Sequence, residues 1–191
     1  MASRGFRERI LEVSADGTAL ASSTTETSLL PNAAYECVLG AGRLRVGSVV
    51  LFSFSGRMST VVTTPGTLTL ALRFGSVDVF SSGGIPLNVT AQTNVHWACS
   101  GELVVRAVGT STAANLMPKN CRFISRAVVG SAAAGSGGVS EEILPYNTAP
   151  AVGTGFDSSV SQLVDFMATW SVSNASNSIQ LHAGSIDVYT Q

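Results

Sequence analysis

Charged side chains are scarce in this chain. Asp, Glu, Lys and Arg make up 12% of its 191 residues, about half the share of an average soluble domain. The formal net charge is −1, below the magnitude of roughly 2–8 that keeps a small isolated domain in solution. Because the cores of protein interfaces are depleted in charge, we expect part of the surface to be covered by other subunits.

Runs of basic residues and long apolar runs are both missing. Basic residues cluster only at Arg4, Arg7 and Arg9, which is not the basic stripe of a nucleic-acid-binding surface. Hydrophobic residues make up 45% and the mean hydropathy is +0.33, yet no stretch reaches the roughly 18 consecutive apolar residues of a transmembrane helix. The first residues also lack the apolar segment of a secretory signal. We therefore expect no nucleic-acid partner, no membrane and synthesis in the cytoplasm.

Few side chains could carry out catalysis or bind a metal. The only histidines are His96 and His182, and each is expected to be held by a backbone group rather than to act as a base. No G-x-S-x-G sequence exposes a nucleophilic serine. Cys37, Cys99 and Cys121 lack the C-x-x-C spacing of zinc sites and are expected as reduced core thiols. The sequence thus predicts no enzyme, no catalytic residue, no metal and no cofactor.

What the chain does contain is a repeated alternation of apolar with small polar residues. Leu68, Leu70, Leu72 and Phe74 show it most clearly. A period of two is that of a strand with one buried face. Turn residues at 63–66, 75–76, 81–84 and 100–101 separate the segments. The expected strands cover residues 43–59, 67–74, 77–80, 87–98, 102–108, 121–129, 162–172 and 179–189, whereas 109–120 reads as a loop.

Eight or nine such strands without alternating helices predict an all-β protein, an antiparallel β-sandwich of jelly-roll type. An immunoglobulin-like sandwich is the alternative, but this chain is nearly twice the usual length. Residues 24–191 form the expected sandwich domain, preceded by an N-terminal arm at 1–23. Residues 1–13 of the arm could form a short amphipathic helix or become ordered only on a partner. The sequence GSAAAGSGG at 130–138 predicts a flexible excursion.

The basic side chains are ten arginines and one lysine, Lys119. Arginine is enriched at interfaces because its guanidinium is weakly hydrated and pairs bidentately, although a codon bias would produce the same composition. The candidate contacts with other proteins are Arg4, Phe6, Arg7, Arg9 and Ile10 in the arm, and Arg43, Arg45, Arg57 and Arg73 in the expected strands.

Several segments resemble virion structural proteins of tailed bacteriophages. They are Arg43–Val46, Gly56–Thr60, Thr64–Thr69 with Arg73–Gly75, Leu87–Thr90, Leu103–Gly109, Thr169–Ser171 and Asn177–Ile179. The resemblance covers roughly residues 24–190, and its motifs are structural, so it supplies no active-site residues. It implies a capsid decoration (cement) protein with a β-sandwich body. Such a protein binds the outer surface of the phage head across junctions between major capsid subunits, and is made in the host bacterial cytoplasm.

The partners implied are the major capsid protein and further copies of this chain. A homotrimer suits the three-fold positions of a shell and is favoured, while a dimer would suit two-fold positions. A receptor- or carbohydrate-binding module of a tail or spike is the alternative, and it predicts an exposed aromatic cluster with nearby amides. A cupin-like or hydrolytic sandwich is a third reading, but the two isolated histidines form no H-x-H pair.

Overall fold

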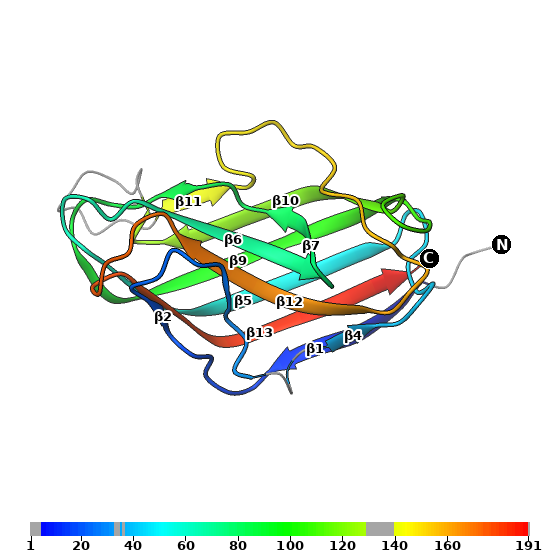
Figure 1. Ribbon diagram of the computed structural model, residues 1–191, viewed down its shortest axis with the longest axis horizontal. Helices are drawn as coiled ribbons and strands as arrows, with labels where there is room; N and C mark the ends of the chain where they lie inside the picture. The colour runs from blue at the N-terminus through cyan, green and yellow to red at the C-terminus, as the bar shows by residue number, and fades with distance from the viewer. Residues whose placement is uncertain (1–4, 33–34, 36, 129–139, 191) are drawn as a thin grey trace.

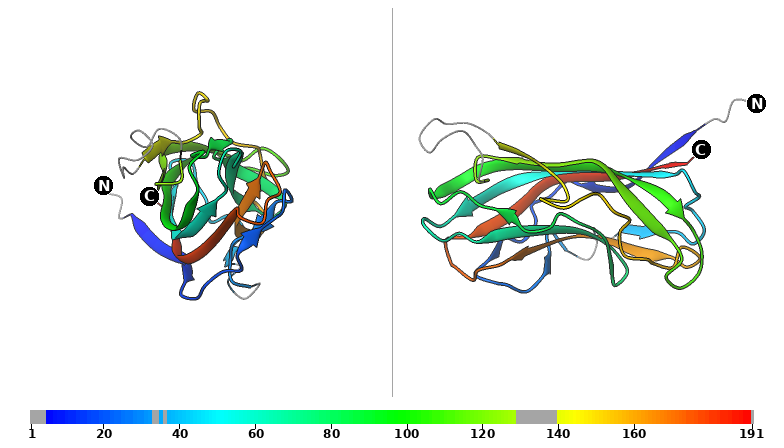
Figure 2. Two further views of the ribbon diagram at one scale, coloured as in Figure 1. Left: turned by 90° about the vertical axis from the view of Figure 1, so that its left-hand side faces the viewer. Right: turned by 90° about the horizontal axis from the view of Figure 1, so that it is seen from above.

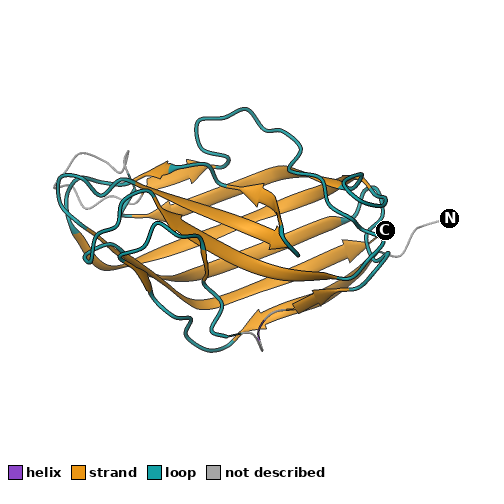
Figure 3. Ribbon diagram, in the orientation of Figure 1, coloured by secondary structure: helices purple, strands orange, loops and turns teal. Residues whose placement is uncertain are grey.

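Two antiparallel β-sheets pack face to face in the computed structural model, which describes residues 5–32, 35, 37–128 and 140–190 (Figure 1). All described elements are strands, with no helix among them (Figure 3). The predicted all-β sandwich is therefore confirmed. Within these ranges no helix is long and apolar enough to cross a membrane.

The two sheets share the strands unequally. In chain order the strands are β1 (Phe6–Val13), β2 (Leu20–Ala21), β3 (Thr27–Ser28), β4 (Cys37–Leu39), β5 (Val49–Thr60), β6 (Thr67–Phe74), β7 (Val77–Ser81), β8 (Ile85–Pro86), β9 (Gln92–Ala107), β10 (Asn115–Ser125), β11 (Ser140–Ile143), β12 (Gln162–Trp170) and β13 (Ser178–Thr190). The seven-stranded sheet has the order β1-β13-β5-β9-β10-β11, with β2 also on β13. The six-stranded sheet has the order β3-β12-β6-β7, with β4 on β12 and β8 on β6.

The core lies between the sheets and is built from the inward positions of the alternating strands. Phe54 of β5 stacks on Phe166 of β12, with ring centroids 4.0 Å apart. Trp97 of β9 lies beside Phe166 at 6.4 Å and is itself fully buried. These aromatic contacts join the two sheets across the sandwich, whose layers are seen edge-on in Figure 2. Aromatic pairs of this kind contribute beyond their buried area.

The N-terminal segment is a strand of the seven-stranded sheet. Residues 6–13 form β1, which pairs with β13 and buries Leu11 and Val13. The short helix considered for residues 1–13 is not formed. A register shift between Arg9 and Leu11 reverses the alternation, so that Arg9 faces outward while Leu11 faces inward. The apolar positions of residues 6–13 therefore match neither the period of a helix nor that of an unbroken strand. The described part of the expected arm, residues 5–23, belongs to the sandwich, since β1 and β2 both pair with β13.

Several expected strand boundaries are wrong, each because of a local feature of the backbone. β9 runs straight through the turn expected at 100–101, because Gly101 occupies an inward position opposite Phe52. β10 begins within the expected loop at 109–120, and a bulge between Lys119 and Arg122 hides its alternation. Residues 43–48 form turns before β5. β11 lies in a region expected to be irregular, and the excursion expected at 130–138 lies outside the described residues.

Deleting residues 1–13 should destabilise the whole sandwich. Burial of Leu11 and Val13 contributes about 1.5–3 kcal/mol each, and the deletion also removes the hydrogen-bond partners of β13. Thermal unfolding followed by circular dichroism should show a large fall in Tm, or the variant should be insoluble. Deleting residues 1–4 alone is the control and should leave Tm unchanged. Equal Tm values for both truncations would show that β1 is dispensable.

Candidate functional site

The outer surface of the seven-stranded sheet, called face A, carries little charge at its centre. Register places outward side chains opposite one another in cross-strand rows that run across β13, β5 and β9. Three rows hold no charge on these strands: Tyr189, Val49 and Val104; Ser185, Ser53 and Ser100; and Ala183, Ser55 and Ala98. Between the first two rows runs a row of Asp187, Leu51 and Glu102. Small and apolar side chains therefore dominate the middle of this face.

Most of the charged side chains between and beside these rows pair within the chain. The pairs are Arg7 with Asp187 at 2.9 Å, Arg9 with Asp187 at 3.1 Å, Lys119 with Glu102 at 3.0 Å and Arg122 with Glu141 at 3.2 Å. A centre of small and apolar groups with a polar margin is the anatomy of a protein–protein interface. Face A is therefore the candidate functional surface.

Asp187 is the one carboxylate of face A that is almost fully buried. Burial by itself raises its pKa, but hydrogen bonds from Arg7 and Arg9 and their positive charges outweigh this effect. The pKa of Asp187 is held below its usual value as a result. This contact fixes β1 to β13 on the outer face, while Leu11 and Val13 fix it on the inner face.

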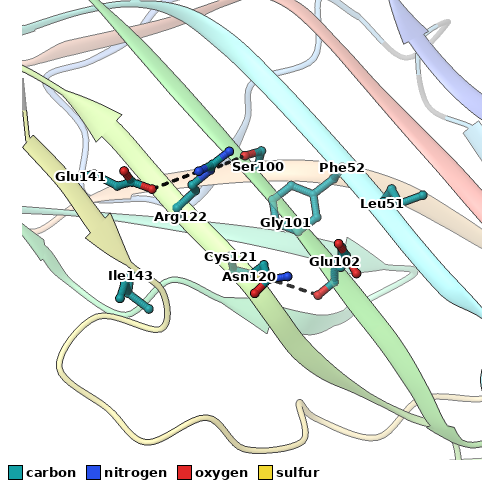
Figure 4. Close-up of a pocket in the computed structure, with 10 residues that line it drawn as sticks. All are labelled: Leu51, Phe52, Ser100, Gly101, Glu102, Asn120, Cys121, Arg122, Glu141 and Ile143. Carbon is teal, nitrogen blue, oxygen red and sulfur yellow. Dashed lines mark hydrogen bonds and ion pairs between the residues drawn. The ribbon is translucent and has the colours of Figure 1, made fainter.

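An open hollow of about 610 Å³ lies on face A over β9, β10 and β11 (Figure 4). Arg122 lies between Glu141 and Ser100, with Nε 3.5 Å from the serine Oγ. The inward-facing Phe52 and Cys121 also line the hollow and form its floor.

The hollow arises from the bulge in β10. Asn120 has a φ of +53°, and the register shift between Lys119 and Arg122 leaves two residues of β10 opposite Gly101. Bulges bend a strand and re-aim its side chains. The lining carboxylates Glu102 and Glu141 already pair with Lys119 and Arg122, so they leave no unpaired charge in the hollow.

The nine predicted contact residues do not form one site. Arg7, Arg9 and Arg57 lie on face A, where Arg57 Nε donates to Gln180 Oε1 at 3.0 Å. Ile10 packs partly buried against the core, and Phe6 is 59% exposed near the end of β1.

The other predicted contacts lie elsewhere. Arg43 and Arg45 were expected within a strand but lie in the turns before β5, and Arg43 pairs with Glu8. The left-handed Gly42 and Gly47 explain this difference, because positive φ values bend the chain there. Arg73 lies on the opposite sheet, and Arg4 lies outside the described residues.

The margin residues Lys119, Glu102 and Asp187 were not predicted as contacts. Their pairing depends on which strands are neighbours and in which register. The only sequence signal is their position, since Glu102 and Asp187 lie within expected strands.

Burial raises the pKa of the cysteine thiols, to about 11 for Cys37 and Cys121 and further for Cys99. All three are free thiols, and Cys99 and Cys121 lie in the core as predicted. Thiols with such pKa values are poor nucleophiles at neutral pH. Among the described residues, no three or more His, Cys, Asp or Glu side chains converge on a possible metal position.

The expectation that backbone groups hold both histidines is wrong. His96 is exposed on face A beside Arg57. His182 Nδ1 lies 2.6 Å from Asp16 Oδ1, a carboxylate in the loop after β1.

Comparisons of the chain with protein-family models, with curated proteins and with solved structures found no match. The function is therefore argued from the fold and the surface.

Replacing Asp187 with Asn should lower stability by about 1–2 kcal/mol, since charge-assisted hydrogen bonds from two half-exposed arginines are lost. The folded-state pKa of Asp187 is lowered. Its contribution is therefore present above the unfolded-state value of about 3.9 and is lost as pH falls through the folded-state pKa. Urea unfolding at pH 7 and pH 3 should show a smaller acid loss in D187N than in the wild type. Equal acid losses would contradict this role.

Replacing Gly101 with Ala should destabilise the protein by about 1–3 kcal/mol through overpacking. A Cβ atom at this inward position would lie 2.4 Å from Cys121 Sγ and 2.9 Å from Phe52 Cζ. Gly40→Ala is the matched control, because a Cβ there meets only the flexible Arg43 side chain at 3.3 Å. Thermal unfolding should separate the two variants, and equal Tm values would contradict the close packing under the hollow.

Proposed function

We propose that this protein is a capsid decoration protein of a tailed bacteriophage, which binds the outer surface of the head and stabilises contacts between major capsid subunits. The observation that carries the proposal is face A, where rows of small and apolar side chains alternate with charged side chains that are mostly paired within the chain. Such a surface is built to be covered by protein. The chain acts by binding alone, as a homotrimer on the exterior of the virion, with no catalytic step.

The strand order supports the jelly-roll type of sandwich. β3 and β4 both pair with β12 and count as one interrupted strand. β2, β8, β10 and β11 are set aside as additions, and the remaining eight strands are numbered 1 to 8 in chain order. In this numbering β1-β13-β5-β9 becomes 1-8-3-6, and β3/β4-β12-β6-β7 becomes 2-7-4-5. This interleaved order supports a jelly-roll arrangement, an architecture found in viral capsid and lectin domains. Fold alone does not fix function, so the order supports the proposal without carrying it.

The positions of the aromatic side chains favour decoration over the alternative, a receptor- or carbohydrate-binding module. Trp97 and Trp170 are both fully buried, and their Nε1 groups donate to backbone carbonyls. Among the described residues, the large aromatics exposed on the surface are Phe6 and Tyr189, near one end of the sheet. The hollow on face A has no exposed aromatic platform on which a sugar ring could stack.

A decoration protein stabilises a shell because it binds the assembled state. Each occupied site adds RT ln(1 + [L]/Kd) to the stability of that state. An oligomer that spans several capsid subunits multiplies the effect, since each further contact forms at high effective concentration. Many weak contacts of small side chains over a broad face then suffice.

Heads assembled without this protein provide the direct test. Added protein should bind at on the order of hundreds of copies per head, as symmetry-related shell sites require, and should raise the temperature at which the heads rupture. A receptor-binding spike would instead be present at on the order of tens of copies. Saturation without any gain in rupture temperature would refute the proposed function.

Ser53→Glu tests whether face A is the surface used. Ser53 is exposed at the centre of the sheet, and a buried unpaired carboxylate would weaken binding to heads by at least about tenfold. Ser76→Glu, in the exposed turn between β6 and β7, adds the same charge elsewhere and should bind normally. Equal binding of both variants in sedimentation with heads would exclude face A.

A further inference from the structure

One end of face A carries basic side chains without carboxylate partners. Arg57 lies opposite His96, and its guanidinium bonds only to the Gln180 amide. Arg126 is exposed in the turn that follows Ser125, and Ser125 lies opposite Trp97, the neighbour of His96 in β9. We call Arg57, His96 and Arg126 the basic patch. Unlike Arg7 or Arg122, its two arginines form no ion pair with a described residue.

The outer surface of the six-stranded sheet, called face B, carries the opposite charge. Arg73 lies at its centre and pairs with Asp78 at 2.7 Å and with Glu26. Asp165 lies directly opposite Arg73 on β12 and accepts a hydrogen bond from Ser28 at 2.6 Å. Asp78 and Glu26 pair with the one guanidinium and Asp165 lies opposite it in register, so the three carboxylates exceed the single positive charge of Arg73.

We infer that the basic patch of one copy packs against the acidic group on face B of the next copy, in a head-to-tail contact. The two unpaired arginines of the patch match the two carboxylates of face B that exceed its single arginine. Complementary patches orient an encounter and exclude wrong partners. A contact between different surfaces of the same chain is heterologous, and it closes into a ring when its rotation divides a full turn.

Apolar side chains on both faces give the contact its desolvated part. On face B, Val38 and Leu163 are opposite each other in register and are 59% and 49% exposed. On face A, Ala183 and Ala98 lie in the row next to Arg57 and His96. Two copies of face B placed together would oppose like charges, so the charges disfavour a symmetric contact through face B and favour the head-to-tail one.

This inference deepens the proposed function, because it names the surfaces that would form the homotrimer. It is nevertheless tested on the free protein, without phage heads. The oligomeric state then reports on the contact between copies, while binding to heads reports on the function. A monomer that still decorates heads would refute the contact alone, and a trimer that never binds heads would refute the function alone.

The experiment uses charge reversal on each surface and on both. Sedimentation velocity should show that R57E/R126E and E26K/D165K each weaken self-association at least about tenfold. The combined variant R57E/R126E/E26K/D165K again carries opposite charges on the two surfaces and should recover assembly. Self-association of the wild type should also weaken from low to high salt, since exposed charges are screened.

R45E/R106E is the matched control. Arg45 and Arg106 are exposed and form no ion pair with a described residue, and the control changes the net charge by as much as R57E/R126E does. It should assemble like the wild type. Circular dichroism verifies folding, and Asp165→Asn with Glu26→Gln serves as a milder variant of face B if the reversal unfolds. A monomeric wild type, normal assembly of R57E/R126E, or no recovery in the combined variant would overturn the inference.

Discussion

The insertion of β13 between β1 and β5 is the constraint on which the rest of the sandwich depends. β13 pairs with both strands over most of its length, so the last strand of the chain holds the first one in place. Its inward positions, including Leu181 and Ile186, are fully buried, while Asp187 on the outward side binds the arginines of β1. A slip of one residue would exchange these two sets, placing a carboxylate in the core. The contacts that complete the sheet are therefore those most distant in sequence, which is typical of slowly folding β-sandwiches.

The sequence predicted β6, β12 and β13, whose alternation is clear over most of their length, and it failed at the bulges of β1 and β10. The expected strand at 67–74 matches β6, and those at 162–172 and 179–189 match β12 and β13 within one or two residues. In β1 the register shift at Ile10 moves the inward-facing positions from even to odd residue numbers. The sequence FRERILEV therefore shows no continuous alternation from which a strand could be recognised. β10 has the same defect at Asn120. A local reading cannot detect a phase change that only the neighbouring strand reveals.

The candidate site could be predicted less well than the fold. Low charge density pointed to a covered surface, and three arginines of face A were named: Arg7 and Arg9 from the expected arm and Arg57 from an expected strand. Their partners depend on register: Asp187 is 178 residues from Arg9 in the chain, and no spacing rule links them. The hollow was also missed, because it exists only where the bulge of β10 lies opposite Gly101. Long-range pairing, rather than side-chain type, therefore determines what this surface presents.

The edges of the seven-stranded sheet explain why association would use faces. An open edge offers unpaired backbone groups to any passing strand, and proteins block this with bulges, inward charges and short edge strands. β1 has a bulge at Ile10 and an inward-facing Glu8 that pairs with Arg43, and β11 has only four residues. The bulge and Glu8 of β1 and the shortness of β11 thus discourage pairing at the edges of the sheet. The serines and alanines at the centre of face A do not hinder contact in this way. A chain that protects its edges in this way leaves association to its faces, and the charges of face A are mostly paired within the chain.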